Sequence, residues 1–441
     1  MDTDGKPEST FQSFFANGNR TLLIKGEPGT GKTTLSLSLA DFLRPSETYY
    51  ISTRVSEEEL FSEFPWLASL GLKIRDVRLG SPETLVEEYA QTLKHDGVLV
   101  ILDSWDSFAN LLDSPTRLKT EQALVALTAS PVCHANTVFV SETMELTHFD
   151  YAVDGVIHLY ASLIDGRRMR AAEIKKLRGT RVKRSVIPFT LQGGRVTLLP
   201  LHTPVSVGNM ARTSPISPDS SGYSLGAPVF DEAFGRIPKG GVFSVEFSGN
   251  VPFQAVRNLG VFPILNFLSL GEGVVWIPHI DKSLNSALDA ISKAIPKEEA
   301  EKRLRVLGLG ESGRSKDYVL KVLGQFEKDT VSVRAASKDG IVVRAMTGSY
   351  LELLYSQGLD EFQLALTRTM QEANSAGDII LFTFRKESPI APLIRSVSDL
   401  LLSMDYLHGV VVVKGEKPYT QLYALYCHED DKVTPVLYPF E

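Results

Sequence analysis

The sequence lacks the features of secreted, disulfide-bonded and membrane-spanning proteins. Among 441 residues there are two cysteines, Cys133 and Cys427, 294 positions apart and outside any CxxC or His–Cys cluster. This excludes a disulfide framework and a zinc ribbon, and it fits a reducing cytoplasm. No apolar run approaches the ~18 residues of a membrane helix, and the polar, acidic start MDTDGKPEST is unlike a signal peptide. We therefore expect a cytoplasmic protein without a membrane span.

Extremes of charge and composition are also missing. The chain has 46 Lys and Arg against 53 Asp and Glu, a formal net charge of −7, with 43% hydrophobic and 22% charged residues. These values are ordinary for globular proteins, so they exclude wholesale disorder. The acidic balance argues against a general nucleic-acid coat. At roughly 150 residues per domain, the length predicts two or three domains.

What the sequence does contain is a glycine-rich turn between a predicted strand and a predicted helix. The run GEPGTGKT at 26–33 follows the apolar residues 21–24 and precedes LSLSLA at 35–40. Glycines allow backbone conformations closed to other residues, so that consecutive N–H groups wrap around phosphates at the start of the helix. This pattern predicts a P-loop that binds ATP. Its nucleotide-binding residues would be Gly26, Glu27, Pro28, Gly29, Thr30, Gly31, Lys32, Thr33 and Thr34.

Side chains around this turn predict a Mg²⁺-ATP site. Lys32 would reach the β- and γ-phosphates, and Thr33 would offer its hydroxyl to Mg²⁺. Asp103 ends an apolar strand at 98–102 and is placed to hold the Mg²⁺ shell as a Walker-B aspartate. A helix cap or turn residue is the alternative for Asp103. Glu142, at the tip of the next strand, is a candidate for positioning or sensing the attacking water.

A proline- and serine-rich linker at 200–223, without apolar periodicity, divides the chain into domains at 1–199 and 224–441. In the first domain strands alternate with helices, which indicates a three-layer α/β fold with ligands beyond the carboxyl ends of the strands. We expect strands at 21–25, 48–52, 98–102 and 137–141, helices at 32–43, 57–62, 83–94 and 119–129, and antiparallel hairpins beyond 153 with turns at 165–166 and 193–194.

Residues 11 to about 200 resemble the KaiC/RadA branch of RecA-type ATPases. The resemblance rests on the P-loop, the strand ending at Asp103, the strand ending at 140–142, the segment 153–157 and Lys176-Leu177-Arg178-Gly179. It implies a RecA-like α/β/α domain. The last segment is similar to the family's KxRG hairpin, which implies that Lys176 and Arg178 act in trans on ATP bound between the protomers of a homo-oligomer. A solvated basic hairpin is the alternative.

One departure from this family concerns catalysis. KaiC-like proteins carry a glutamate just after the second strand, where this chain has Arg54 and Val55. Three glutamates follow at 57–59, but Ser56 with Glu59 forms a capping-box pattern, which favours a structural role for them. ATP binding is therefore expected with slow hydrolysis at most.

The segments LLIKGEPGTGKTTLSL and YISTRVSEEELFSEFPWL resemble the archaeal gas vesicle regulator family GvpD more closely than KaiC. This resemblance implies an amino-terminal P-loop and arginine-rich segments that regulate through contact with a transcriptional activator. Residues 167–184 carry nine Lys or Arg against one Glu. Contacts to ATP in trans, docking of an acidic partner and a nucleic-acid track are the three open roles. Nucleic acid is not favoured, because the run has no aromatic residue for base stacking.

The second half resembles a degenerate copy of the first. Residues 224–249 resemble the KaiC-type segment that precedes the P-loop, but 248–254 lack GK[ST], and Ala345 takes the aspartate's place on the strand 340–346. Mg-ATP would lose several charge-assisted contacts there, each of about 1.5–3 kcal/mol. With a helix at 360–374 and strands at 378–384 and 410–414, the pattern predicts a pseudo-ATPase domain. An unrelated α/β domain is the alternative.

Two functions remain open from the sequence. The leading one is an ATP-binding regulatory switch, a slow ATPase that controls a transcriptional or signalling partner through nucleotide-dependent assembly. The other is a RecA/RadA-like DNA-dependent ATPase that acts in recombination or repair.

Overall fold

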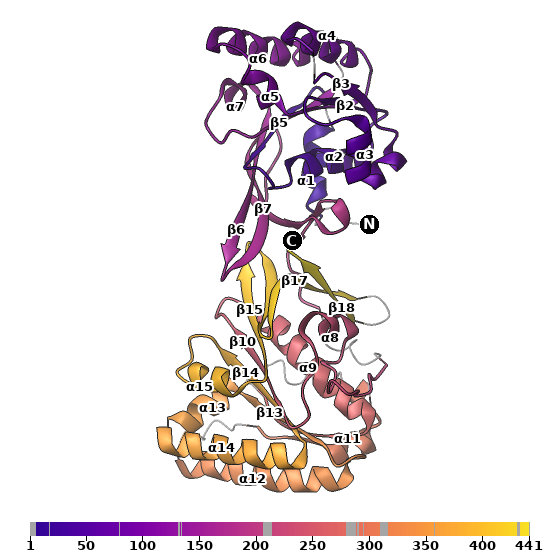
Figure 1. The fold of residues 1–441 in the computed structure, drawn as a ribbon. Helices are drawn as coiled ribbons and strands as arrows, with labels where there is room; N and C mark the ends of the chain where they lie inside the picture. The colour runs from indigo at the N-terminus through magenta and orange to yellow at the C-terminus, as the bar shows by residue number, and fades with distance from the viewer. Residues whose placement is uncertain are drawn as a thin grey trace. The chain divides into compact units, whose positions relative to one another are not determined.

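The apolar runs of the first half form one mixed β-sheet (Figure 1). In the computed structural model, the described residues of this half contribute nine strands in the order β3-β2-β4-β5-β1-β6-β7-β8-β9. The strands from β3 to β6 are parallel to their neighbours, whereas β6 to β9 pair antiparallel. Their bounds are β1 Thr21–Gly26, β2 Thr48–Ser52, β3 Lys73–Asp76, β4 Leu99–Asp103, β5 Asn136–Ser141, β6 Gly155–Ile164, β7 Arg167–Leu177, β8 Val186–Thr190 and β9 Thr197–Leu198.

Helices cover both faces of this sheet. Successive side chains of a strand point to opposite faces, so Leu22 and Ile24 of β1 join one apolar core and Leu23 joins the other. The first core includes α1 (Glu8–Phe15), α2 (Lys32–Leu43), α3 (Glu57–Glu63) and the 3₁₀ helix η2 (Pro65–Leu70). The second includes α4 (Pro82–Thr92), α5 (Trp105–Ala109), α6 (Ser114–Thr128) and α7 (His148–Ala152). A further 3₁₀ turn, η3, spans Gln192–Gly194. The predicted α/β class is confirmed.

The structure describes residues 6–16, 18–78, 80–130, 133, 135–205, 214–278, 288, 291–293, 295–308, 316–356, 358–429 and 433–440. The chain divides into one unit of Met1–Leu201 with Pro439–Glu441 and another of His202–Tyr438. Part of the expected linker, 206–213, lies outside the described residues. No helix among the described residues is both long and apolar enough to cross a membrane.

The second unit has a sheet of the same design. Its nine described strands follow the order β12-β11-β13-β14-β10-β15-β16-β17-β18, which matches the first sheet position by position. Again the strands up to β15 are parallel, and the β15–β16 and β16–β17 pairs are antiparallel. Their bounds are β10 Val242–Phe247, β11 Gly273–Ile277, β12 Leu304–Val306, β13 Val342–Thr347, β14 Ile379–Arg385, β15 Leu400–Leu407, β16 Val410–Lys417, β17 Tyr419–Glu429 and β18 Val433–Pro439.

Helices also form two layers around the second sheet. One apolar core includes α8 (Pro228–Phe234), α9 (Phe253–Leu270) and α11 (Lys297–Arg303). The other includes α12 (Lys316–Ala336), α13 (Gly348–Tyr355), α14 (Leu359–Ala376) and α15 (Ala391–Val397). Both units are therefore three-layer α/β/α structures built on the same strand order.

One hydrogen-bonding pattern relates the two sheets residue by residue. In the first unit, the backbone N–H of Thr21 donates to Oδ2 of Asp154 at 3.1 Å. In the second, the backbone N–H of Val242 donates to Oδ2 of Asp399 at 2.8 Å. Thr21 and Val242 thus occupy the same place in their sheets, and equivalent positions on neighbouring strands follow from the registers.

Candidate nucleotide-binding site

Residues 26–33 form the expected turn between β1 and α2. Gly29 and Gly31 have φ angles of +76° and +97°, which side chains rarely adopt, and Gly31 is the N-cap of α2. A Cβ on Gly26 would lie 2.6 Å from the carbonyl oxygen of Leu159 and from Oγ1 of Thr30. Each of the three glycines is therefore required by the backbone path or by a close approach.

The two predicted Mg²⁺ ligands lie together beyond the loop. Oγ1 of Thr33 donates to Oδ2 of Asp103 at 2.6 Å. The hydroxyl of Tyr50, on β2, donates to the same oxygen at 3.0 Å. Asp103 is 6% exposed, and burial raises the pKa of its carboxyl. A hydroxyl beside a carboxylate is an oxygen pair suited to Mg²⁺. Tyr50 had no signal in the sequence, because its contact depends on the packing of β2 beside β4.

Lys32 points back into the loop that precedes it. Its ammonium donates to the backbone carbonyl of Glu27 at 3.0 Å, and its side chain is almost fully buried. Burial lowers the pKa of Lys32, while the charges of Glu142 and Asp103 act in the opposite direction. A partly desolvated cation at the N-terminus of a helix is suited to bind phosphate oxygens.

A cavity of about 430 Å³ opens at this loop. Its lining combines the P-loop with Asp103 and with side chains from β2, α3 and the end of β5. They are Pro28, Gly29, Gly31, Lys32, Thr33, Thr34, Tyr50, Arg54, Val55, Leu60, Glu63, Phe64, Asp103, Glu142 and Leu191. The cavity lies at the carboxyl ends of parallel strands, where ligands of such sheets bind.

Glu142 lines this cavity, but it is not free. Nη1 of Arg54 donates to Oε1 of Glu142, so the two side chains form an ion pair. The backbone N–H of Glu142 donates in turn to Oδ2 of Asp106 at 2.5 Å. The arginine found where KaiC-like proteins have a glutamate therefore pairs with the other candidate for positioning water.

The glutamates of α3 fall into two groups. Ser56 and Glu59 form the expected capping box: the Glu59 backbone N–H donates to Ser56 Oγ at 3.2 Å, and the Ser56 N–H donates to Glu59 Oε2 at 2.7 Å. Glu63, by contrast, lines the cavity. Sequence reasoning missed it, although it lies three residues after the buried Leu60 and hence on the same helix face.

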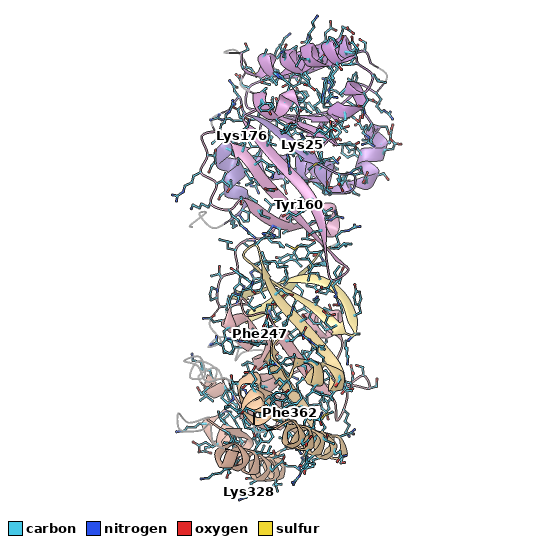
Figure 2. All side chains as sticks on the ribbon, turned by 90° about the vertical axis from the view of Figure 1, so that its left-hand side faces the viewer. Lys25, Tyr160, Lys176, Phe247, Lys328 and Phe362 are labelled. Atoms are coloured by element: carbon cyan, nitrogen blue, oxygen red, sulfur yellow. The ribbon has the colours of Figure 1, made fainter. Side chains whose placement is uncertain are left out.

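The structure places Lys176 and Arg178 away from the P-loop of their own chain. In the sheet register Leu177 is opposite Gly155, which is opposite Leu22 at the start of β1, whereas the P-loop follows the end of β1. Lys176 Nζ donates to the carbonyl of residue 150 at 2.9 Å, and Arg178 Nη2 to that of residue 151 at 3.2 Å. Figure 2 shows Lys176 on the ribbon of the first unit. From this position the pair does not contact the P-loop of its own chain.

Another arginine of the same strand does reach the P-loop. Nη1 of Arg170 donates to the carbonyl oxygen of Gly29 at 2.6 Å, and Arg170 is 6% exposed. Arg167 is also buried. The arginine-rich run is thus no uniform surface, and Arg170 belongs to the support of the nucleotide site. Sequence reasoning left the role of this run open, because composition alone does not show which face of β7 a residue occupies.

In the second unit, aromatic residues stand in the place of the phosphate cradle. Five residues separate β10 from α9, as five separate β1 from α2, so Phe247 corresponds to Gly26 and Phe253 to Lys32. The two rings lie 6.4 Å apart, centroid to centroid, in an edge arrangement. They line a cavity of about 710 Å³, together with Arg385 at the position that corresponds to Glu142.

The registers correct one expectation for this unit. Leu102 pairs with Phe139 on β5, and Met346 pairs with Phe382 on β14, so that Thr347, not Ala345, corresponds to Asp103. The expectation was wrong because the position equivalent to Asp103 is the last residue of β13, two residues beyond Ala345. The Thr347 hydroxyl is buried and has no hydrogen-bond partner among the described residues.

Comparisons with known proteins agree with this geometry. Residues 11–71 match the family model of the GvpD gas vesicle protein, P-loop domain. The chain is 29% identical over 322 residues to protein GvpD2 and 28% identical over 306 residues to protein GvpD1, both of Halobacterium salinarum (strain ATCC 700922 / JCM 11081 / NRC-1). These matches cover 66% and 62% of this chain, and 65% and 56% of the two relatives. The chain is therefore related to the GvpD proteins through a GvpD-like P-loop domain.

Proposed function

We propose that this chain is an ATP-binding regulatory switch, of the kind that its GvpD relatives imply for gas vesicle formation. The observation that carries the proposal is the site itself. Lys32 and Thr33 lie within residues 11–71, which match the GvpD P-loop domain, and Thr33 is hydrogen-bonded to Asp103 on a later strand. The backbone N–H groups of residues 29–33 and the Lys32 ammonium would hold the phosphates, and Thr33 with Asp103 would hold Mg²⁺.

Slow hydrolysis is part of this proposal. A general base must be within hydrogen-bond reach of the water it activates and must be able to accept its proton. Glu142 is paired with Arg54, and Glu63 lies on the exposed helix α3. Neither carboxylate is supported as a dedicated base, so bound ATP would persist and act as a signal.

Arg170 offers a physical link between the nucleotide and the basic run. Because it donates to the Gly29 carbonyl, a rearrangement of the P-loop on phosphate binding would act directly on β7. Exposed cations on and after that strand, such as Arg168 and Arg181, would then be presented differently to an acidic regulatory partner. In this way the regulatory partner would distinguish the ATP-bound chain from the empty chain.

Association of protomers is the second proposed consequence of ATP binding. Lys176 and Arg178 lie level with the start of β1, whereas the P-loop follows its end. This position is compatible with contacts to ATP on a neighbouring protomer of a homo-oligomer. Arginines supplied in trans accelerate phosphoryl transfer by about 10³- to 10⁵-fold in other systems.

Light scattering of the full chain with and without Mg-ATP, beside measurement of ATP turnover, tests the proposal. We expect ATP-dependent association that Arg178→Ala weakens, with turnover below ~1 s⁻¹ that single-stranded DNA does not stimulate. Lys175→Ala, on the strand that precedes Arg178, is the matched control, since that lysine pairs with Glu173. Strong stimulation by single-stranded DNA would contradict the switch and support the DNA-dependent ATPase instead.

A further inference from the structure

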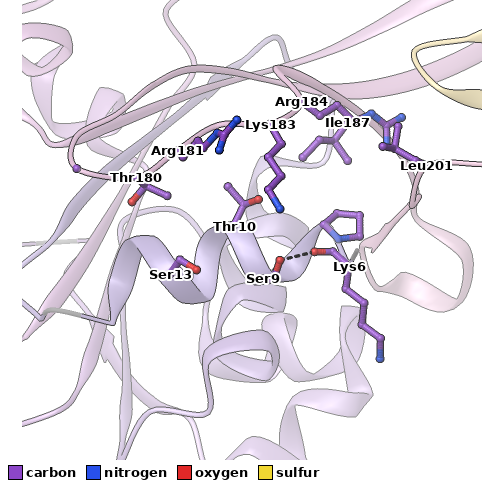
Figure 3. Close-up of a pocket in the computed structure, with 12 residues that line it drawn as sticks. Lys6, Ser9, Thr10, Ser13, Thr180, Arg181, Lys183, Arg184, Ile187 and Leu201 are labelled. Atoms are coloured by element: carbon purple, nitrogen blue, oxygen red, sulfur yellow. Dashed lines mark hydrogen bonds between the residues drawn. The ribbon is translucent and has the colours of Figure 1, made fainter. Parts of the chain in front are cut away.

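A second cavity of the first unit lies between α1 and the segment that follows β7 (Figure 3). Its volume is about 330 Å³, and it shares no described lining residue with the P-loop cavity. Lys6 and hydroxyls of α1 lie on one side, and a hydroxyl and three basic residues lie on the other. These polar residues are Lys6, Ser9, Thr10, Ser13, Thr180, Arg181, Lys183 and Arg184.

The charged residues among the described lining of this cavity are all basic. No Asp or Glu occurs among its described lining residues. Elsewhere on the basic run, acidic side chains neutralise the cations: Lys175 lies 2.7 Å from Glu173, and Arg178 lies 3.9 Å from Asp154. Arg181, by contrast, forms no hydrogen bond or ion pair with any residue that the structure describes.

Two other basic residues that follow β7, Lys183 and Arg184, also line the cavity. Nη1 of Arg184 donates to the carbonyl of Leu199 at 2.8 Å, which orients the guanidinium. Lys183 extends from its segment toward Ser9 and Thr10 on α1, as Figure 3 shows. Cations and hydroxyls thus converge on one space from two separate segments of the chain. The Ser9 hydroxyl among them donates to the carbonyl of Lys6 at 2.7 Å.

We propose that this cavity binds a small anion that carries phosphate groups. Guanidinium and ammonium groups form charge-assisted hydrogen bonds to phosphate oxygens, and Ser and Thr hydroxyls add neutral donors. Pockets for small molecules begin at about 300 Å³, so the space suits a diphosphate-sized group. Because its described lining offers no carboxylate to a cation, the anion binds without Mg²⁺, unlike ATP at the P-loop. The proposal does not depend on the switch function, although the two share Arg181.

Isothermal titration calorimetry with inorganic pyrophosphate and EDTA tests this site on the full chain carrying Lys32→Ala, which disables the P-loop. We expect saturable binding of one pyrophosphate per chain. Adding Arg181→Gln and Lys183→Gln, both at exposed positions, should weaken it at least tenfold. The matched control, Arg168→Gln with Lys175→Gln, removes the same charge from exposed positions of β7 and should change the affinity less than twofold.

Titration of the same protein with ADP and with pyrophosphate distinguishes a nucleotide ligand from a free polyphosphate. Tighter binding of ADP than of pyrophosphate would identify a nucleotide, and equal or weaker binding would identify a free polyphosphate; both support the site. Absence of saturable binding, or equal weakening in the control pair, would overturn it. So would binding of a hexaglutamate peptide or single-stranded DNA, but not of pyrophosphate, that depends on Arg181 and Lys183.

Discussion

At the scale of single residues, the nucleotide site combines side chains that a sequence motif identifies with others that only the fold brings together. The glycines, Lys32 and Thr33 are recognisable because the P-loop is local in sequence. Tyr50 and Arg170 contact the site only because β2 lies beside β4 and β7 folds back along β6. No spacing rule connects residues so far apart in the chain, so pattern reasoning could not find them.

Arg54 is the residue whose change is most informative about catalysis. Its ion pair with Glu142 holds the carboxylate that could otherwise accept a proton from water. Arg54→Gln should therefore raise ATP turnover about tenfold or more, within the roughly 10²- to 10⁴-fold that general bases contribute. A phosphate-release assay at saturating Mg-ATP measures this.

The matched control for this prediction is the double variant Arg54→Gln with Glu142→Gln, which should return to the rate of the unmodified protein. If the double variant is as fast as Arg54→Gln alone, Glu142 is not the base. Adding Glu63→Gln to the Arg54→Gln chain is then the decisive comparison, because Glu63 is the other glutamate among the described lining residues.

At the scale of elements, apolar runs predicted β1, β2, β4 and β5 within one or two residues, and the helix at 32–43 corresponds to α2. The short edge strand β3 was missed because its residues, KIRD, are largely exposed and lack an apolar pattern. α1 was missed because an eight-residue segment gives little periodicity to detect. Strand pairing, and with it the position of Thr347, depends on registers that composition does not contain.

One buried ion pair joins β1 to α7 close to the P-loop. Lys25 Nζ lies 2.9 Å from Asp150 Oδ2, with the two side chains 0% and 7% exposed. Although burial alone would raise it, hydrogen bonds from Thr147 and Lys25 hold the pKa of Asp150 below its ordinary value. Removing one partner of such a pair leaves a buried charge uncompensated, which costs about 3–5 kcal/mol.

Asp150→Asn should therefore destabilise the first unit by about 3–5 kcal/mol in urea unfolding at pH 7. Glu47→Gln, which breaks the exposed pair with Lys73, is the control and should leave the midpoint nearly unchanged. Because the folded pKa is depressed, the stabilisation is complete above the ordinary carboxyl pKa of about 3.9 and is lost as the pH falls through the lowered value. An equal loss in the two variants at pH 7 would contradict this account.

At the scale of the whole molecule, two α/β/α units with the same strand order differ at the place where a nucleotide would bind. The first has glycines, Lys32 and Asp103; the second has Phe247, Phe253 and Thr347 at the corresponding positions. The sequence showed the loss of the motif but not what replaced it, because the equivalence of Lys32 and Phe253 follows from strand and helix bounds. Each full chain should therefore bind a single Mg-ATP.

Calorimetric titration of the full chain with ATP, with Mg²⁺ and with EDTA, tests this claim most directly. The difference between the two titrations should correspond to one Mg²⁺-dependent site per chain. That site should be absent in Lys32→Ala and retained in Phe253→Leu, the change at the equivalent position of the second unit. Two Mg²⁺-dependent sites per chain, or undiminished binding in Lys32→Ala, would contradict the assignment of the P-loop as the nucleotide site of this protein.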